Sequence, residues 1–173
     1  MNKIIRRLTE TGLLLALLIV LQAVTKPLSQ LVTGSCVNTV LAISVLFAGL
    51  PAGITVAVLS PVLAFLLGIA PQIWTVPAIM VGNTVYVILL HYICGKRTKN
   101  YLRLALGWLT AAAAKFAVLY ALVVWVICGI FLAGTPLATK LPAMFSWPQL
   151  ITALIGGGLA LLIAPGLRKA LKK

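Results

Sequence analysis

One basic residue, Lys115, lies inside a long apolar stretch, where a charged side chain is costly and is therefore a candidate for function. It lies about 11 residues into a run that begins near residue 104, and a rise of 1.5 Å per residue places it near the membrane centre. The sequence holds a single acidic residue, Glu10, and none that is available to neutralise Lys115. Three interpretations stay open. Lys115 is neutral and bonded to carbonyl groups, its side chain extends along the helix to the membrane surface, or an anionic ligand binds it.

A second group of polar side chains lies near the outer ends of the apolar stretches, on the side that the distribution of cations assigns to the outside. The group consists of Lys26, Gln30, Asn38, Trp74, Asn83, Trp147 and Gln149. An outward-facing pocket lined by amides, tryptophans and lysines suits a small polar, anionic organic molecule. For Trp74 and Trp147 the alternative is anchoring at the membrane surface. For Asn38 and Asn83 it is hydrogen bonding between helices.

Several other residues are interpreted as packing contacts. Gln22 is expected to form a hydrogen bond between helices rather than to belong to the site. Gly12 and Ala16 form a small-xxx-small pair, which allows another helix to approach closely, and Gly156 and Gly157 contribute small residues near the C-terminus. Packing within the bundle is expected to explain most of these small residues.

The scarcity of acidic residues excludes several classes of chemistry. One carboxylate cannot supply an acid–base pair, a carboxylate-held metal site or an Asp-rich diphosphate site. Cys36, Cys94 and Cys128 show no CxxC spacing and are expected to be small buried apolar residues. A membrane enzyme that uses Cys36 and His91 is an alternative, but we expect these residues on the order of 20 Å apart, too far for a dyad. The sequence therefore predicts no catalytic residue, no metal and no cofactor.

The composition shows which elements position these residues. Of the 173 residues, 62% are hydrophobic and 9% are charged, and the mean hydropathy is +1.17, whereas a soluble domain has about 25% charged residues. The sequence therefore predicts an all-α integral membrane protein with one domain, residues 1–173. A spanning helix needs about 20 apolar residues. Six such helices are predicted, near residues 8–25, 33–50, 52–70, 75–94, 104–132 and 147–167. Thr135 to Pro142 is predicted to be the longest uncharged connection, interrupted only by Lys140.

The distribution of lysine and arginine predicts the orientation. Eleven of the 14 lie in the N-terminal segment, the fourth connection and the C-terminal segment, whereas the connections on the other side hold only Lys26 and Lys140. Cytoplasmic loops of membrane proteins carry such an excess of cations. Both termini are therefore predicted to be cytoplasmic, and the net charge of +13 faces anionic lipid headgroups of the bilayer rather than nucleic acid.

Six spans in fewer than 200 residues, a basic N-terminal segment and a polar first outer loop resemble the substrate-binding S components of energy-coupling-factor (ECF) transporters. The resemblance covers the whole chain in architecture. It is carried by the stretch from Gln22 to Pro27, by the stretch from Thr33 to Asn38, and by Gly53 to Pro61. It implies a multi-pass protein of the bacterial cell membrane.

The resemblance also implies a mechanism. S components capture a vitamin or precursor from outside, dock on a transmembrane coupling protein that carries two ATPase subunits, and are thought to topple in the membrane to release the cargo. Their docking face carries an Ala-x-x-x-Ala pattern on the first helix, for which Gly12 and Ala16 stand here, with glycine in place of the first alanine. The implied substrate-binding residues are Lys26, Gln30, Asn38, Trp74, Asn83, Lys115, Trp147 and Gln149. Nickel and cobalt members carry an N-terminal histidine segment, and this sequence begins Met1-Asn2-Lys3, so metal uptake is not expected.

A stand-alone carrier or channel is the alternative to a substrate-binding subunit. Proton coupling in a membrane usually needs an acidic residue within a span, and the sequence has neither such a residue nor a GxxxxGK[ST] phosphate loop for ATP hydrolysis. It also shows no internal repeat. These features favour a subunit that takes its energy from a partner. No titratable pattern distinguishes niacin, pantothenate, folate, a pyrimidine or a queuosine precursor as the cargo.

Overall fold

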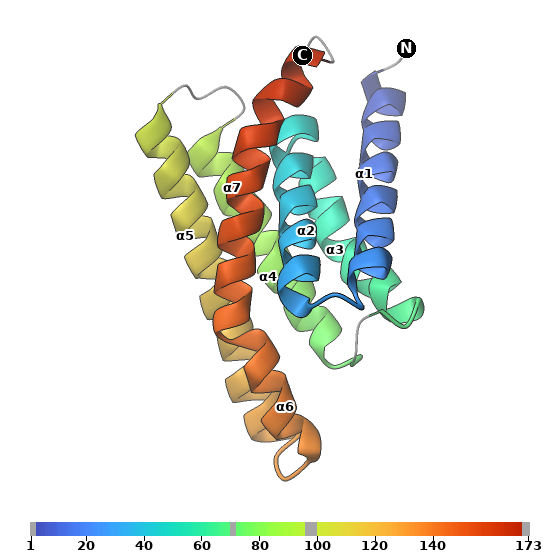
Figure 1. Ribbon diagram of the computed structural model, residues 1–173, viewed down its shortest axis with the longest axis vertical. Helices are drawn as coiled ribbons and strands as arrows, with labels where there is room; N and C mark the ends of the chain where they lie inside the picture. Colours follow the sequence, from blue (N-terminus) through green and yellow to red (C-terminus); the bar gives the residue numbers. More distant parts are fainter. Residues whose placement is uncertain (1–2, 70–71, 96–99, 171–173) are drawn as a thin grey trace.

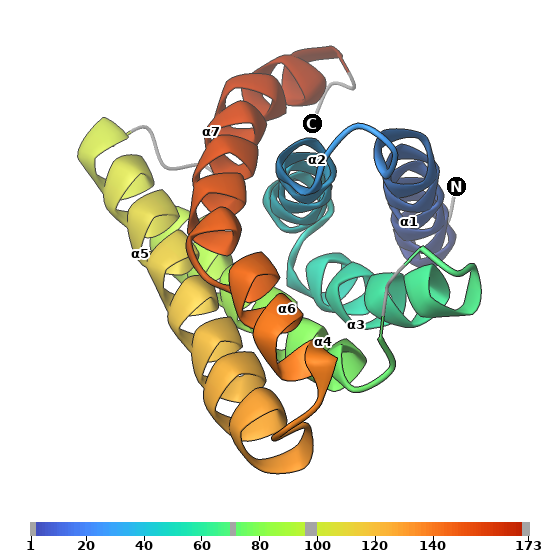
Figure 2. The ribbon, with the colours of Figure 1, turned by 60° about the horizontal axis from the view of Figure 1, so that its bottom comes forward.

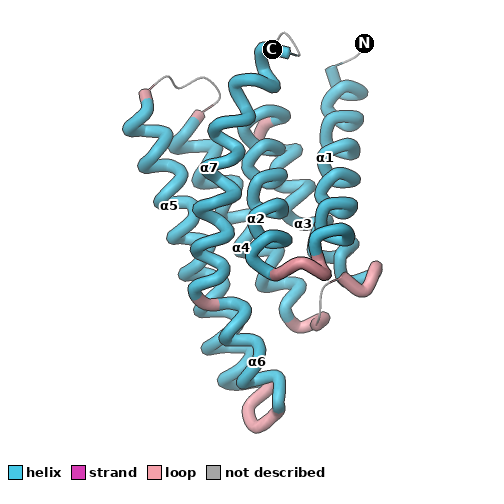
Figure 3. The backbone as a smooth tube through the Cα atoms, in the orientation of Figure 1, coloured by secondary structure: helices cyan, strands magenta, loops and turns pink. Residues whose placement is uncertain are grey.

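The structure, a computed structural model, describes residues 3–69, 72–95 and 100–170, and every regular element in these ranges is a helix (Figure 1). Short connections join the helices (Figure 3). The elements are α1 (Lys3–Thr25), α2 (Gln30–Ile43), α3 (Leu50–Leu66), α4 (Thr75–Leu89), α5 (Tyr101–Leu119), α6 (Pro136–Phe145) and α7 (Trp147–Ala170). Three π-helices, η1 (Ser44–Ala48), η2 (Leu90–Cys94) and η3 (Tyr120–Phe131), continue α2, α4 and α5.

Successive segments run in opposite directions through the bundle. The start of α1 and the end of α7 lie at one end, together with the turn between η1 and α3 (Figure 1). The α1–α2, α3–α4 and η3–α6 connections lie at the other end (Figure 1). This alternation agrees with the prediction that both termini lie on one side. Following the predicted orientation, we call these two ends the inner end and the outer end. The predicted loop cations Lys96, Arg97 and Lys99, and Lys172 and Lys173, lie outside the described residues.

Within the described residues, five helical segments are long and apolar enough to cross a membrane, so the protein is a multi-pass membrane protein. They are Ile4–Thr25, Gln30–Ala48, Thr75–Cys94, Tyr101–Phe131 and Pro136–Leu167. The remaining predicted span is the shorter helix α3, which has 17 residues and ends at Leu66 rather than near residue 70. Gly68, with a φ of 66°, follows it in a left-handed conformation that reverses the chain.

The segment predicted as the longest loop is instead a helix, so that prediction is wrong. Residues 136–145 form α6, which with η3 makes a helical hairpin that extends beyond the other helices at the outer end (Figures 1 and 2). Gly134, with a φ of 79°, allows the tight reversal after η3. Pro136 then starts α6, a position that proline favours because its fixed φ suits the first helical turn and its missing N–H would have no partner there.

Glycines allow α2 and α7 to pack in close contact. A Cβ atom added to Gly156 would lie 2.5 Å from Asn38 Cβ and 2.6 Å from the carbonyl oxygen of Ser35, and one on Gly34 would lie 2.8 Å from Thr152 Cγ2. Gly156 therefore packs within the bundle, as predicted. Gly12 differs, because a Cβ added there would meet nothing within 4 Å.

We expect Gly156→Ala to lower the free energy of unfolding by about 1–3 kcal/mol, because the added methyl group collides with the backbone of α2. Thermal unfolding of the detergent-solubilised protein measures this change. Gly12→Ala is the matched control, since its methyl group meets open space and alanine favours a helix. Equal unfolding temperatures for the two variants would contradict the close contact between α2 and α7.

Candidate ligand-binding site

Lys115 lies at the centre of a polar cluster built from three helices. Its Nζ atom, on α5, donates hydrogen bonds to Oδ1 of Asn38 on α2 (2.5 Å) and to Oδ1 of Asn83 on α4 (2.7 Å). The side chain is only 3% exposed. It therefore does not extend to the membrane surface, and that interpretation of the sequence is wrong. The two asparagines make hydrogen bonds between helices at the same place.

Small residues next to the cluster set its geometry. Gly82 precedes Asn83 on α4, and a Cβ added there would lie 2.7 Å from Cγ of Leu119, one turn beyond Lys115 on α5. α4 and α5 therefore approach closely where Lys115 and Asn83 meet. On the other side, Asn38 donates from Nδ2 to Oγ1 of Thr152 on α7 (3.2 Å), which fixes the orientation of its amide.

Tyr86 closes the site toward the inner end. Its ring centroid lies 5.4 Å from Nζ of Lys115, and the side chain is fully buried. A cation at this distance is attracted by the face of an aromatic ring. The hydroxyl of Tyr86 donates to the carbonyl oxygen of Ala153 on α7 (3.2 Å), so the ring is held between α4 and α7.

A cavity of about 410 Å³ leads from this cluster toward the outer end, and its size is that of a small-molecule site. The structure brings six of the eight predicted substrate-binding residues to its lining. They are Lys26, Gln30, Asn38, Asn83, Lys115 and Gln149. The buried members lie on α2, α4 and α5, whereas Lys26 is exposed at the end of α1.

Hydrogen bonds from side chains to backbone join the segments around the outer part of the cavity. Nζ of Lys26 donates to the carbonyl oxygen of Gly68, which follows α3 (2.6 Å). Nε2 of Gln30 and Nε2 of Gln149 both donate to the carbonyl oxygen of Met144, at 2.7 and 3.2 Å. The starts of α2 and α7 are thus tied to the end of α6.

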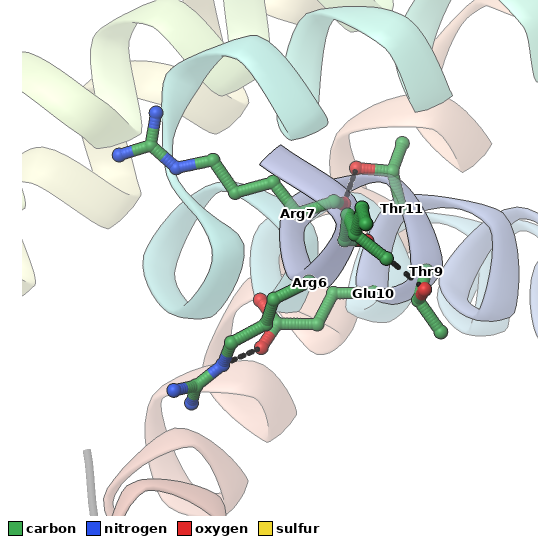
Figure 4. A network of polar contacts seen from close by, with 6 residues as sticks. Arg6, Arg7, Thr9, Glu10 and Thr11 are labelled. Atoms are coloured by element: carbon green, nitrogen blue, oxygen red, sulfur yellow. Dashed lines mark hydrogen bonds and ion pairs between the residues drawn. The ribbon is translucent and has the colours of Figure 1, made fainter. Parts of the chain in front are cut away.

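Two lysines and no acidic residue line the cavity among the described residues, because the acidic residue of the sequence lies elsewhere. Glu10 accepts a hydrogen bond from Nε of Arg6 at 3.0 Å, near the inner end of α1 (Figure 4). Arg6 lies one helical turn before Glu10 on α1, and the two form an ion pair. Glu10 does not line the cavity. An anion is the ligand that this distribution of charge favours.

Two predicted residues do not line this cavity. Trp74 is 56% exposed and lines a separate apolar cavity of about 290 Å³ between α4 and η3. Trp147 is 68% exposed, and its ring stacks on that of Phe116, with centroids 5.8 Å apart. Exposed tryptophans near the ends of membrane helices are typical of anchors at the membrane surface, which was the alternative interpretation for both.

Two polar residues of the lining were not assigned to the site from the sequence, Gln22 and Thr33. Gln22 lies one turn beyond Leu18, which is fully buried, so it lies on the inward side of α1, a side that the hydropathy of this helix does not mark in the sequence. Its Oε1 atom is buried and has no hydrogen-bond partner among the described residues. The hydrogen bond between helices that we expected for Gln22 is therefore not made by this oxygen.

The part of the chain that the structure describes holds no group of three or more His, Cys, Asp or Glu side chains that could bind a metal ion. Cys94 and Cys128 are buried, and Cys36 is half-buried. The polar groups around the cavity are amides, a hydroxyl and the side-chain nitrogens of two lysines, which can bind and orient a ligand.

Comparison with known proteins gives one family. The family model described as "ECF transporter, substrate-specific component" matches residues 6–168. No curated protein and no solved structure matches the chain.

Proposed function

This chain belongs to the family of substrate-specific components of ECF transporters, and we propose that it captures a small anionic vitamin or precursor from outside a bacterial cell. The family and the apolar helices make it a multi-pass membrane protein that serves transport. The proposal adds the charge of the substrate, the side from which it enters and the partners that use it.

The buried Lys115 supports an anionic substrate more than any other observation. An ammonium group has three N–H donors, and two of them are bonded to the neutral oxygens of Asn38 and Asn83. A buried charge without a counter-charge is unfavourable by several kcal/mol. A carboxylate or phosphate of the substrate would accept the third hydrogen bond and supply the counter-charge.

The shape of the cavity supports entry from the outer end. Lys26, at the exposed end of the lining, would attract an anion toward Lys115, and Tyr86 blocks the way to the inner end. With the predicted orientation, the outer end faces the outside of the cell.

The proposed partners are a transmembrane coupling protein and two ATPase subunits. The sequence has no GxxxxGK[ST] phosphate-loop motif for ATP hydrolysis, which supports a partner as the source of energy. Of the five spanning windows, that of α1 has the smallest buried share, 11% against 50% for α2 with η1. Gly12 and Ala16 lie on its exposed side, and we propose that a helix of the coupling protein packs there.

Reconstitution tests the proposal against the stand-alone carrier. Proteoliposomes that contain only this protein, incubated with the small-molecule filtrate of a yeast extract, should contain no compound in excess of the amount that the protein itself binds. Proteoliposomes that also contain the coupling protein and ATPases, with ATP, should accumulate at least one anionic compound. Mass spectrometry of the vesicle contents measures both results. Accumulation by the protein alone would establish the carrier instead.

A further inference from the structure

Gln22 brings to the cavity a hydrogen-bond acceptor that the described protein does not satisfy. Its Oε1 atom is buried and has no partner among the described residues, although the side chain lines the cavity. A buried acceptor without a donor is unfavourable, so such an atom in a ligand cavity points to a donor that the ligand brings.

The position of Gln22 on α1 explains why its side chain lies on the inward side of the helix, beside the cavity. Leu18, Gln22 and Thr25 follow one another at the spacing of one helix face, and Leu18 and Thr25 are both buried. The hydroxyl of Thr25 donates to the carbonyl oxygen of Leu21 (2.6 Å), so this neighbour does not supply the missing donor.

Several donors elsewhere in the lining are directed to other acceptors. Lys26 donates to Gly68, and Gln30 and Gln149 donate to Met144. Lys115 donates to its two asparagines. The cavity therefore presents two different requirements, one for an anion at Lys115 and one for a donor at Gln22.

We propose that the substrate is an anion that also carries an N–H or O–H group outside its acidic group, and that this group donates a hydrogen bond to Oε1 of Gln22. The proposal rests on the proposed function and narrows the substrate to carboxylates or phosphates with an amide, a ring N–H or a hydroxyl. Gln22 on α1 and Lys115 on α5 come from helices on different sides of the bundle but line the same cavity, so one substrate can contact both (Figure 2).

Selectivity follows from the chemistry of the oxygen. A site that hydrogen-bonds a substrate N–H or O–H discriminates strongly against an analogue without it, because the buried protein group is then left unpaired. In this proposal Lys115 makes the site bind anions, and Gln22 determines which anions bind best.

The experiment uses the purified full chain in detergent, incubated with the small-molecule filtrate of a yeast extract, and mass spectrometry of the retained compounds. Wild type should retain anionic compounds that each carry an N–H or O–H outside the acidic group. Gln22→Met, which keeps the length of the side chain but removes the oxygen, should retain them at least 10-fold less. Val24→Met is the matched control on the exposed side of α1 and should retain them as wild type does.

A second measurement uses the retained compound and a synthetic analogue that lacks the donor. Wild type should bind the analogue at least 10-fold more weakly than the retained compound, whereas Gln22→Met should bind the two equally. If Gln22→Met does not fold, the wild-type comparison decides alone. Retained compounds without such a donor, or equal binding of the analogue by wild type, would show that water satisfies Oε1 and would overturn the inference.

These results separate the inference from the proposed function. If wild type retains no anionic compound, or Lys115→Met retains as much as wild type, the proposed function fails and the inference fails with it. If retention depends on Lys115 but not on Gln22, only the inference fails.

Discussion

Lys115→Met should weaken binding of the retained anionic compound by about 100-fold or more, the effect of removing one member of a buried, charge-assisted hydrogen bond. Methionine is close to lysine in length, so the side chain still fills the space between α2 and α4. It offers no N–H donor and no charge to the anion. The oxygens of Asn38 and Asn83 would then face the anion without the ammonium group between them, which adds repulsion to the lost attraction.

Equilibrium dialysis of the purified variants with the identified compound measures this loss, and thermal unfolding shows that the variant is folded. Lys140→Met is the matched control, because this lysine on α6 is exposed and does not line the cavity. Lys115→Arg separates charge from shape, since the larger guanidinium must displace one asparagine, and we expect intermediate binding. Wild-type affinity in Lys115→Met would mean that the anion binds elsewhere.

The sequence analysis assigned Lys115, Asn38 and Asn83 to one predicted site, and polar residues such as these are informative because they lie in a membrane. A lysine or an asparagine within an apolar helix needs a partner, and the available partners lie on neighbouring helices. The structure joins these three residues directly, as two hydrogen bonds from Lys115. The membrane also made the helical bundle predictable from hydropathy, because a segment must be apolar over a sufficient length to span it.

The direction of a side chain at the membrane surface was harder to predict. Trp74 and Trp147 lie at helix starts near the outer end, and the sequence does not show which way each helix turns there. Gln22 lies in a helix whose hydrophobic residues face both the bundle and the surroundings, so its pattern does not mark one face as buried.

The helix α6 was missed because Pro136, Pro142 and Thr135 are typical of loops, although proline also starts helices.

Ala16→Trp should abolish uptake driven by the coupling protein and ATPases while leaving retention of the anionic compound within about twofold of wild type. Ala16 and Gly12 lie one turn apart on the exposed side of α1, and a Cβ added at Gly12 meets nothing within 4 Å. A bulky side chain there has room within this chain. It would hold a partner helix away, because membrane helices pack closely where both present small residues.

Two measurements on the same variant distinguish docking from binding: uptake into proteoliposomes that contain the coupling protein, the ATPases and ATP, and co-purification with the coupling protein. We expect both to fall at least 10-fold for Ala16→Trp. Leu162→Trp is the matched control. Leu162 on α7 is 80% exposed, so this substitution adds the same indole group to a different face of the bundle. Wild-type uptake by Ala16→Trp would show that the coupling protein docks on another surface. Because Ala16 does not line the cavity and Gln22 does, loss of uptake with intact retention would assign docking and binding to different sides of one helix.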